Sequence, residues 1–189
     1  MAGSFSVFDA ARLMLAAVFL FSICALGIAL LGEHVFGIRP CILCLYQRVP
    51  YVISAVLAGA AAALPISIGA RRLALALCGV VFTAGVALAF YSVGVEEHWW
   101  AGVPGCDGSP TMTFTVDDIR KLSATASSLR SCDVDVWHLF GFSLAAYNAV
   151  SQLLATGACF LALRWFSRRD APLGPRLSPF LRKGLEQKL

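Results

Sequence analysis

Four long stretches without a charged residue constrain the fold of this chain more than any other feature. They run over 13–31, 49–70, 73–95 and 139–163, and each holds between 19 and 25 residues. At about 1.5 Å rise per residue, a helix of that length spans the roughly 30 Å hydrocarbon core of a bilayer. The sequence therefore predicts an all-α integral membrane protein built as a four-helix bundle.

Composition supports a chain that is embedded in a membrane. Charged residues make up 14% of the 189 residues, and the mean hydropathy is +0.77. A soluble domain has about 25% charged residues, so this balance excludes a disordered chain and a nucleic-acid partner. The first stretch is longer than the apolar core of a signal peptide and lacks an A-x-A cleavage pattern before Glu33. We expect it to be retained as a span.

The distribution of Lys and Arg predicts the orientation of the spans. Of the 15 basic residues, 10 lie on the side of the termini and 5 on the opposite side. Cytoplasmic segments carry the excess of Lys and Arg, so we expect both termini in the cytoplasm of a bacterium and the chain in its inner membrane. The segments at about 32–48 and 96–138 are then outer loops. The second is a long extracytoplasmic loop between helices 3 and 4, with seven acidic and three basic residues.

We divide the chain into a four-span membrane domain, 1–166, and a basic cytoplasmic tail, 167–189. The tail contains three prolines and is expected to contact anionic membrane lipid. Within the second outer loop, Thr115 and Asp118 have the spacing of a capping box, which predicts a short amphipathic helix over 115–129. That helix would either lie on the membrane surface and carry Cys132 toward Cys41, or act as a simple spacer.

The seven cysteines divide into two groups by position. Three lie inside the predicted spans, where cysteine packs as a small apolar residue: Cys24, Cys78 and Cys159. The others lie at or beyond the outer boundary of the bilayer, in a compartment where disulfides form and persist: Cys41, Cys44, Cys106 and Cys132. Four cysteines on one oxidising face indicate redox chemistry.

Cys41 and Cys44 form a C-x-x-C motif that follows Pro40 and begins the second span. The free amides and the dipole at a helix start favour a thiolate over a thiol. At 100° per residue, Cys41, Cys44 and Arg48 fall within about 60° of one face, so Arg48 can stabilise a thiolate or another developing anion. A cation at the bilayer edge is costly and marks a functional candidate, although Arg48 could also be an anchor that reaches the lipid headgroups.

The C-x-x-C motif alone admits other interpretations. A c-type haem site needs a histidine directly after the second cysteine, where this chain has Leu45. Zinc could recruit the second cysteine pair or a histidine, but 25 residues separate that pair, unlike in a zinc knuckle, and we predict no metal site. The candidates for such a site are Cys106, Cys132, His34, His98 and His138. Two structural disulfides that staple the outer loops are a further alternative.

Two segments resemble the disulfide bond formation protein B (DsbB) family. They are P-C-I-L-C-L-Y-Q-R at 40–48 and C-D-V-D-V-W-H-L-F-G at 132–141. Together with four spans and a wide cysteine pair in the second outer loop, they extend the resemblance over nearly the whole chain. Gln47 departs from the pattern, because some relatives have an acidic residue there. The resemblance implies a redox disulfide between Cys41 and Cys44 and another between Cys106 and Cys132.

The resemblance also implies a relay of electrons. A reduced periplasmic thiol oxidase of the thioredoxin fold, similar to DsbA, would attack at Cys106, and Cys132 would then attack Cys41. Cys44 would pass the electrons to a membrane quinone, with ubiquinone expected rather than menaquinone and Arg48 as a binding residue. Because a DsbA-type partner is strongly oxidising, at about −120 mV, its reoxidation needs an acceptor of still higher potential, which a quinone supplies.

His98 stands where the third span emerges, and the resemblance suggests a place beside the quinone head group. There it could donate a hydrogen bond to a carbonyl or transfer a proton; an exposed interfacial histidine is the alternative. Trp99, Trp100 and Trp137 are expected in the aromatic belt of the interface. Two other functions stay open: a non-catalytic membrane scaffold with structural disulfides, and a quinone enzyme similar to vitamin K epoxide reductase.

Overall fold

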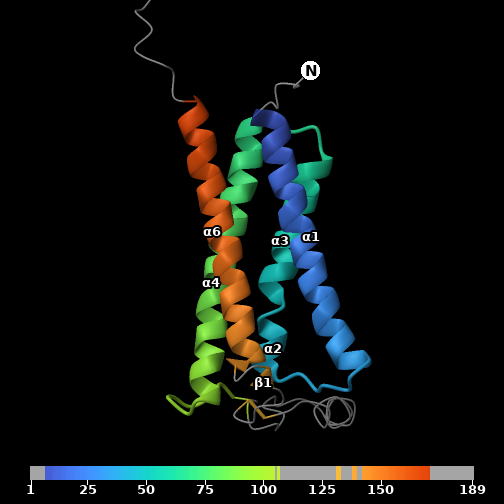
Figure 1. Cartoon of the computed structure of the whole chain (residues 1–189), viewed down its shortest axis with the longest axis vertical. Coiled ribbons are helices and arrows are strands. Elements are labelled where there is room, and N and C mark those ends of the chain that lie inside the picture. The colour runs from blue at the N-terminus through green and yellow to red at the C-terminus, as the bar shows by residue number, and fades with distance from the viewer. Residues whose placement is uncertain (1–6, 105, 107–130, 133–137, 140–141, 171–189) are drawn as a thin grey trace, which may run out of the picture.

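Four long helical segments run side by side in the computed structural model of the chain (Figure 1). The structure describes residues 7–104, 106, 131–132, 138–139 and 142–170. The helices are α1 (Val7–His34), α2 (Ile42–Tyr46), α3 (Val49–Ala63), α4 (Ile68–Glu96) and α6 (Leu144–Asp170). Two short strands, β1 (His138–Leu139) and β2 (Phe142–Ser143), pair antiparallel before α6, with His138 opposite Ser143. The four segments Phe8–His34, Ile42–Ala63, Ile68–Glu96 and Leu144–Arg168 are long and apolar enough to cross a membrane, which confirms the predicted bundle.

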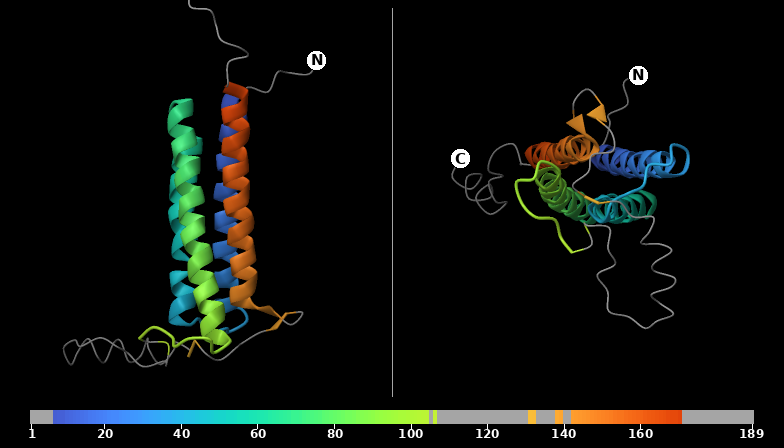
Figure 2. Two further views of the ribbon diagram at one scale, coloured as in Figure 1. Left: turned by 90° about the vertical axis from the view of Figure 1, so that its left-hand side faces the viewer. Right: turned by 90° about the horizontal axis from the view of Figure 1, so that it is seen from below.

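The helices form two pairs, with α4 packed along α6 and α1 along α3. Seen along the bundle axis, α6 and α1 make one side, and α4 and α3 make the other (Figure 2). Val7 and Asp170, where the described chain begins and ends, lie at the same end of the bundle (Figure 1). The end of α1, the short helix α2 and the start of α6 all lie at the opposite end, which we call the loop end.

The second span begins and ends earlier than the charge-free stretch over 49–70 predicts. It consists of α2 and α3, which are separated at Gln47 and Arg48. The interruption follows from Pro50, because proline has no N–H to donate to the carbonyl one turn earlier. At its other end, α3 stops at Ala63 because Leu64 precedes Pro65 and is extended, with φ −78° and ψ 148°. The stretch 49–70 thus contains a turn between helices that no charged residue marks.

The fourth span begins later than the stretch 139–163 predicts. Residues 138–139 and 142–143 pair as strands, and α6 starts at Leu144. The local reason is Ser143, whose Oγ accepts a hydrogen bond from the backbone N–H of Ala146 at 3.2 Å in the manner of an N-cap. The helix predicted over 115–129 and the tail over 171–189 lie outside the described residues.

The apolar core lies toward the end of the bundle opposite the loop end. Its buried members include Leu15, Leu75, Phe82 and Phe166. Cys78 and Cys159 are fully buried in this core, as expected of cysteines that serve as packing. Cys24 differs, because its side chain is exposed on α1. The prediction of a packing role therefore holds for two of the three cysteines in the spans.

Candidate redox site

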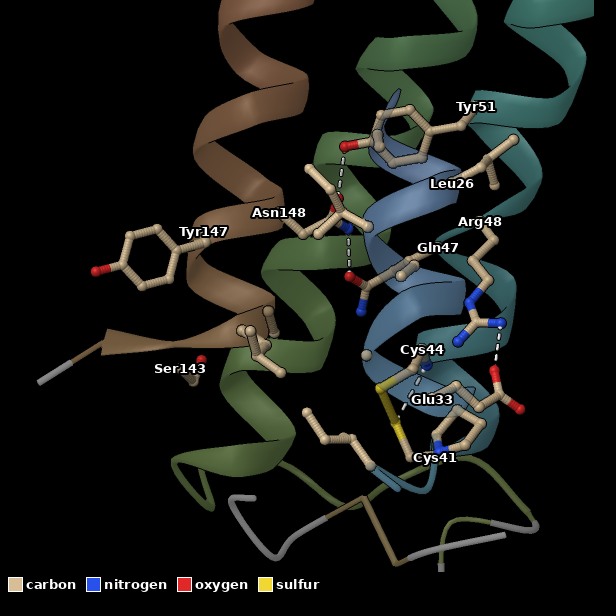
Figure 3. A pocket seen from close by; sticks show the side chains of 18 of the residues that line it. Leu26, Glu33, Cys41, Cys44, Gln47, Arg48, Tyr51, Ser143, Tyr147 and Asn148 are labelled. Atoms are coloured by element: carbon tan, nitrogen blue, oxygen red, sulfur yellow. Dashed lines mark hydrogen bonds and ion pairs between the residues drawn. A yellow bond between two sulfur atoms is a disulfide. The ribbon is translucent and has the colours of Figure 1, made fainter. Parts of the chain in front are cut away.

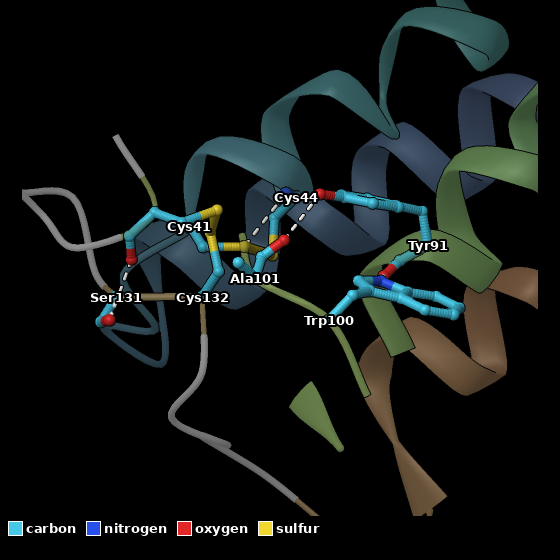
Figure 4. The surroundings of a disulfide bond; sticks show 8 residues. Cys41, Cys44, Tyr91, Trp100, Ala101, Ser131 and Cys132 are labelled. Carbon is cyan, nitrogen blue, oxygen red and sulfur yellow. Dashed lines mark hydrogen bonds between the residues drawn. A yellow bond between two sulfur atoms is a disulfide. The ribbon is translucent and has the colours of Figure 1, made fainter. Parts of the chain in front are cut away.

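The four outer cysteines form two disulfides that lie close together at the loop end. Cys41 is joined to Cys44 and Cys106 to Cys132, with Cα–Cα distances of 5.0 Å and 4.9 Å. Cys41, Cys106 and Cys132 are all less than 8% exposed and pack in one cluster with Leu43 and Val95 (Figure 4). The fold thus places two disulfides, which are far apart in the sequence, in one apolar cluster.

The C-x-x-C motif begins α2. Cys41 is the N-cap, with φ −85° and ψ 168°, and its Sγ accepts a hydrogen bond from the backbone N–H of Cys44 at 3.1 Å. Pro40 therefore precedes the N-cap and does not lie in the first turn. The amide hydrogen bond at the start of α2 therefore goes to the sulfur of Cys41, the N-cap, while Cys44 lies in the first turn itself.

Hydrogen bonds also join the two chain segments that carry the second disulfide. Cys132 donates its N–H to the carbonyl of Cys106 at 2.8 Å, and Ser131 Oγ donates to the same carbonyl at 2.9 Å. Gly102 allows this close approach, because a Cβ atom there would lie only 2.6 Å from Cys106 Cβ and 2.9 Å from its Sγ. These contacts fix Cys106 and Cys132 relative to each other, and the buried cluster places both beside Cys41.

A cavity of about 710 Å³ opens beside the Cys41–Cys44 disulfide, between α1, the second span and the start of α6 (Figure 3). Both cysteines of the motif line it, together with Cys132 and Arg48. The wall formed by α1 is apolar and includes Leu26, Ile28 and Leu31. The volume lies within the range of about 300 to 1,000 Å³ that is typical of sites for small organic molecules.

A row of hydrogen-bonded polar side chains lines the cavity farther from the loop end. Tyr51 Oη donates to Asn148 Oδ1 at 2.6 Å and lies 2.8 Å from Ser151 Oγ. Asn148 Nδ2 in turn donates to Gln47 Oε1 (Figure 3). We call Gln47, Tyr51, Asn148 and Ser151 the polar row. The polar row links α3 and α6. It forms one polar region of the cavity wall, and Arg48 and Glu33 form another.

Arg48 lines the cavity but is not a free cation. Its Nη1 donates to Glu33 Oε2 at 2.9 Å, which ties the second span to the end of α1. The two side chains are 21% and 32% exposed, so the pair lies at a partly wet edge of the cavity. Glu33 therefore balances the charge that the sequence assigns to the redox site.

His98 is not among the described residues that line this cavity, although Glu96, two residues earlier, is. His98 follows the end of α4 with φ 59°, and its side chain is exposed. Its N–H donates to the carbonyl of Val95, while the N–H of Trp99 donates to that of Gly94. These two bonds are those of a Schellman motif, in which His98 occupies the position usually held by glycine.

The sequence analysis missed Glu33 and the polar row. One sequence feature indicates the polar row. Asn148 and Gln152 are four residues apart in a mostly apolar stretch and so share a helix face. Polar side chains inside a span usually face the bundle interior or a cavity. Glu33 is a single acidic residue at the end of a span, and no sequence pattern indicates which basic residue it pairs with.

Comparison with known proteins agrees with this geometry. The family model described as "Disulfide bond formation protein DsbB" matches residues 11–162. The chain is 31% identical to the disulfide bond formation protein B of Marinobacter nauticus over 158 residues, which cover 79% of this chain and 92% of that protein. It is also 31% identical to the protein of the same name from Acinetobacter baumannii, over 80% of this chain and 90% of that protein. No solved structure gives a significant match. With four membrane-capable helices and two cysteine pairs at one end of its bundle, this chain belongs to the DsbB family of membrane proteins that act in disulfide bond formation.

Proposed function

We propose that this chain is an inner-membrane thiol oxidoreductase that reoxidises a periplasmic DsbA-like dithiol oxidase and passes the electrons to a membrane quinone. The observation that carries the proposal is the packing of both disulfides in one cluster beside an apolar cavity that reaches into the bundle. A soluble partner can reach one pair at the loop end, while a lipid-soluble acceptor can approach the other from between the helices.

A series of thiol–disulfide exchanges transfers the electrons through the chain. A thiolate of the partner attacks Cys106 Sγ, which breaks the Cys106–Cys132 bond and releases the Cys132 thiolate. Cys132 then attacks Cys41 Sγ, which breaks the Cys41–Cys44 bond and releases the Cys44 thiolate. The second thiol of the partner displaces Cys106, so the partner loses two electrons and two protons in forming its own disulfide. The freed Cys106 thiolate attacks Cys132 Sγ, which re-forms the Cys106–Cys132 bond and releases Cys41, so that Cys41 and Cys44 together hold the two electrons. Such exchange requires close approach of the sulfurs, and Cys132 and Cys41 share one cluster.

The residues around the cavity fit a quinone. Its apolar walls suit an isoprenoid-bearing ring, and Arg48 and the polar row supply groups that can hold ring oxygens. Gln47 has a buried side-chain nitrogen without a hydrogen-bond partner among the described residues. A bound quinone would accept two electrons and two protons. Our proposal assigns His98 no contact with it, because the described lining of the cavity does not include that residue.

A coupled assay tests the proposal. The purified protein in detergent is mixed with ubiquinone and a reduced DsbA-type partner, and quinone absorbance is followed together with the thiol content of the partner. We expect the loss of quinone to match the oxidation of the partner, and the Cys44→Ser variant to abolish both. Cys106→Ser and Cys132→Ser should block oxidation of the partner.

The acceptor and the alternatives are separate outcomes of this assay. Turnover with menaquinone but not with ubiquinone would correct the identity of the quinone and leave the relay intact. The proposal would be overturned if correctly disulfide-bonded protein showed no turnover with either quinone. That result would favour a membrane scaffold whose disulfides are structural. Turnover of a quinone epoxide instead would favour an enzyme similar to vitamin K epoxide reductase.

A further inference from the structure

The side-chain amide of Gln47 is oriented by hydrogen bonds to its neighbours. Asn148 Oδ1 accepts from Tyr51 Oη at 2.6 Å and from Gln152 Nε2 at 3.4 Å, so the other end of the Asn148 amide is its NH₂ group. That group donates to Gln47 Oε1. An amide whose oxygen accepts this bond must present its nitrogen, a donor, on the opposite side. A flip of Gln47 alone would set its NH₂ group against the NH₂ group of Asn148, two donors that cannot bond to each other.

The nitrogen that Gln47 presents has no partner. Gln47 is only 5% exposed, and its Nε2 is buried without a hydrogen-bond acceptor among the described residues. In Figure 3 this nitrogen lies on the side of the amide that faces the Cys41–Cys44 disulfide. A buried donor without a partner is costly, and such groups in native proteins call for an explanation. Here the unmatched donor faces the sulfur of a redox-active pair.

The backbone places Gln47 on the same face as Cys44. The two residues are three apart, and the carbonyl of Leu43 accepts from the N–H of Gln47 at 3.0 Å, so the helical path continues to Gln47. Residues three apart on a helix are surface neighbours. Arg48, the other donor near this sulfur, is already paired with Glu33. Gln47 is thus the nearby donor that lacks a partner while the disulfide is closed.

We propose that Gln47 donates a hydrogen bond to the Cys44 thiolate when the Cys41–Cys44 disulfide opens. The inference rests on the exchange step of the proposed function, in which Cys132 attacks Cys41 Sγ and the bonding pair of the Cys41–Cys44 bond leaves on Cys44. The donor without a partner then gains an anionic acceptor, which stabilises the open state relative to the closed one. Asn148 and Tyr51 are positioning residues, because they hold the amide with its nitrogen toward the sulfur.

The redox equilibrium of the Cys41–Cys44 pair tests this role without any quinone or partner. The full chain carrying Cys106→Ser and Cys132→Ser is equilibrated with glutathione buffers, and mass spectrometry of alkylated peptides gives the disulfide fraction. Because Gln47 stabilises only the reduced state, Gln47→Leu should shift the equilibrium constant roughly tenfold toward the disulfide. Gln47→Glu keeps the shape and the acceptor for Asn148 but loses the donor, so it should shift the equilibrium in the same direction at least as far.

Ser22→Ala is the matched control. It also removes a buried polar side chain inside a span, but Ser22 Oγ donates to the carbonyl of Val18 within α1 and so bonds within its own helix. It should leave the equilibrium constant within about twofold of its parent. The proposal fails if both Gln47 variants stay within twofold, or if Ser22→Ala shifts the constant as far as they do. Absence of quinone turnover in the coupled assay would overturn the proposed function and leave this result standing, since glutathione alone opens the disulfide here.

Discussion

His98 holds a backbone conformation that few side chains adopt. Its φ of 59° lies in the left-handed region, where a non-glycine residue costs about 1 to 2 kcal/mol. Histidine and asparagine tolerate this region better than most residues, and β-branched residues tolerate it least. We therefore assign His98 to the end of α4, where its N–H and that of Trp99 satisfy the last carbonyls of the helix.

Substitutions at His98 should follow backbone preference. We expect His98→Gly to change the free energy of unfolding by between zero and about +1 kcal/mol, because relief of strain is partly offset by the greater freedom of glycine in the unfolded chain. His98→Asn should be close to neutral, whereas His98→Val should cost about 1 kcal/mol or more. Thermal unfolding in detergent measures all three. A valine variant as stable as the glycine variant would contradict the assignment.

At the scale of residues, the sequence predicts correctly those relations that lie within one helix. The periodicity of a helix places Arg48 on the face of Cys41 and Cys44, and all three line one cavity. The same reasoning could not find the partner of Arg48. Glu33 is 15 residues away, and Asn148, the partner of Gln47, is 101 residues away. Contacts between helices depend on which helices are neighbours, and periodicity within one helix carries no such information.

At the scale of elements, length and lack of charge predict how many spans there are better than where they end. The predicted spans all correspond to helices, but their bounds follow local chemistry. Pro65 ends one helix, Ser143 begins another, and Pro50 divides the second span. Bounds taken from charge therefore missed the turn between α3 and α4, which contains no charged residue.

Gly94 lets the chain fold back on α4 after that helix ends. A Cβ atom at Gly94 would lie 2.0 Å from Cζ2 of Trp100, whose ring stacks on Tyr91 and whose Nε1 donates to the Tyr91 carbonyl at 3.0 Å. Gly94→Ala should displace the indole and cost about 1 to 3 kcal/mol, as overpacking does. Thermal unfolding and tryptophan fluorescence would report the loss and the displacement.

Gly27 provides the matched control for that substitution. It also lies inside a long helix, but a Cβ atom there would meet nothing within 4 Å. Gly27→Ala should therefore raise stability by up to about 1 kcal/mol, through helix propensity alone. Equal effects of the two alanine substitutions would show that the contact between Trp100 and α4 contributes nothing to stability.

On the scale of the whole molecule, alternation of spans and loops brings the redox groups together. Four spans place the first and second outer loops at one end, so the cysteines of both loops meet there. They do so although 61 residues, which include α3 and α4, lie between Cys44 and Cys106. The sequence could predict this meeting, because it depends only on the number of crossings. The cavity and the polar row depend on how α1, α3 and α6 are arranged around each other, which the number of crossings does not determine.

The orientation of the bundle in the membrane is the last prediction, and it rests on charge. Arg12 lies near the start of α1, and Arg71 and Arg72 lie near the start of α4, with Arg71 over the ring of Phe8 at the start of α1. Seven more basic residues follow from Arg164 onward. By the excess of Lys and Arg, the end of the bundle opposite the loop end should face the cytoplasm and the disulfides should face the periplasm. Alkaline phosphatase needs disulfides to fold and is therefore active only outside the cytoplasm.

Two fusions to this enzyme test the orientation. Joined after Ala101, beyond the third span, alkaline phosphatase should be active; joined after Leu189, it should be inactive, and a green fluorescent protein fused there should fluoresce. Immunoblots would confirm that both fusions are present in equal amounts. The opposite pattern would place both cysteine pairs in the cytoplasm, where glutathione keeps thiols reduced. The chain would then have no disulfide with which to oxidise a periplasmic partner.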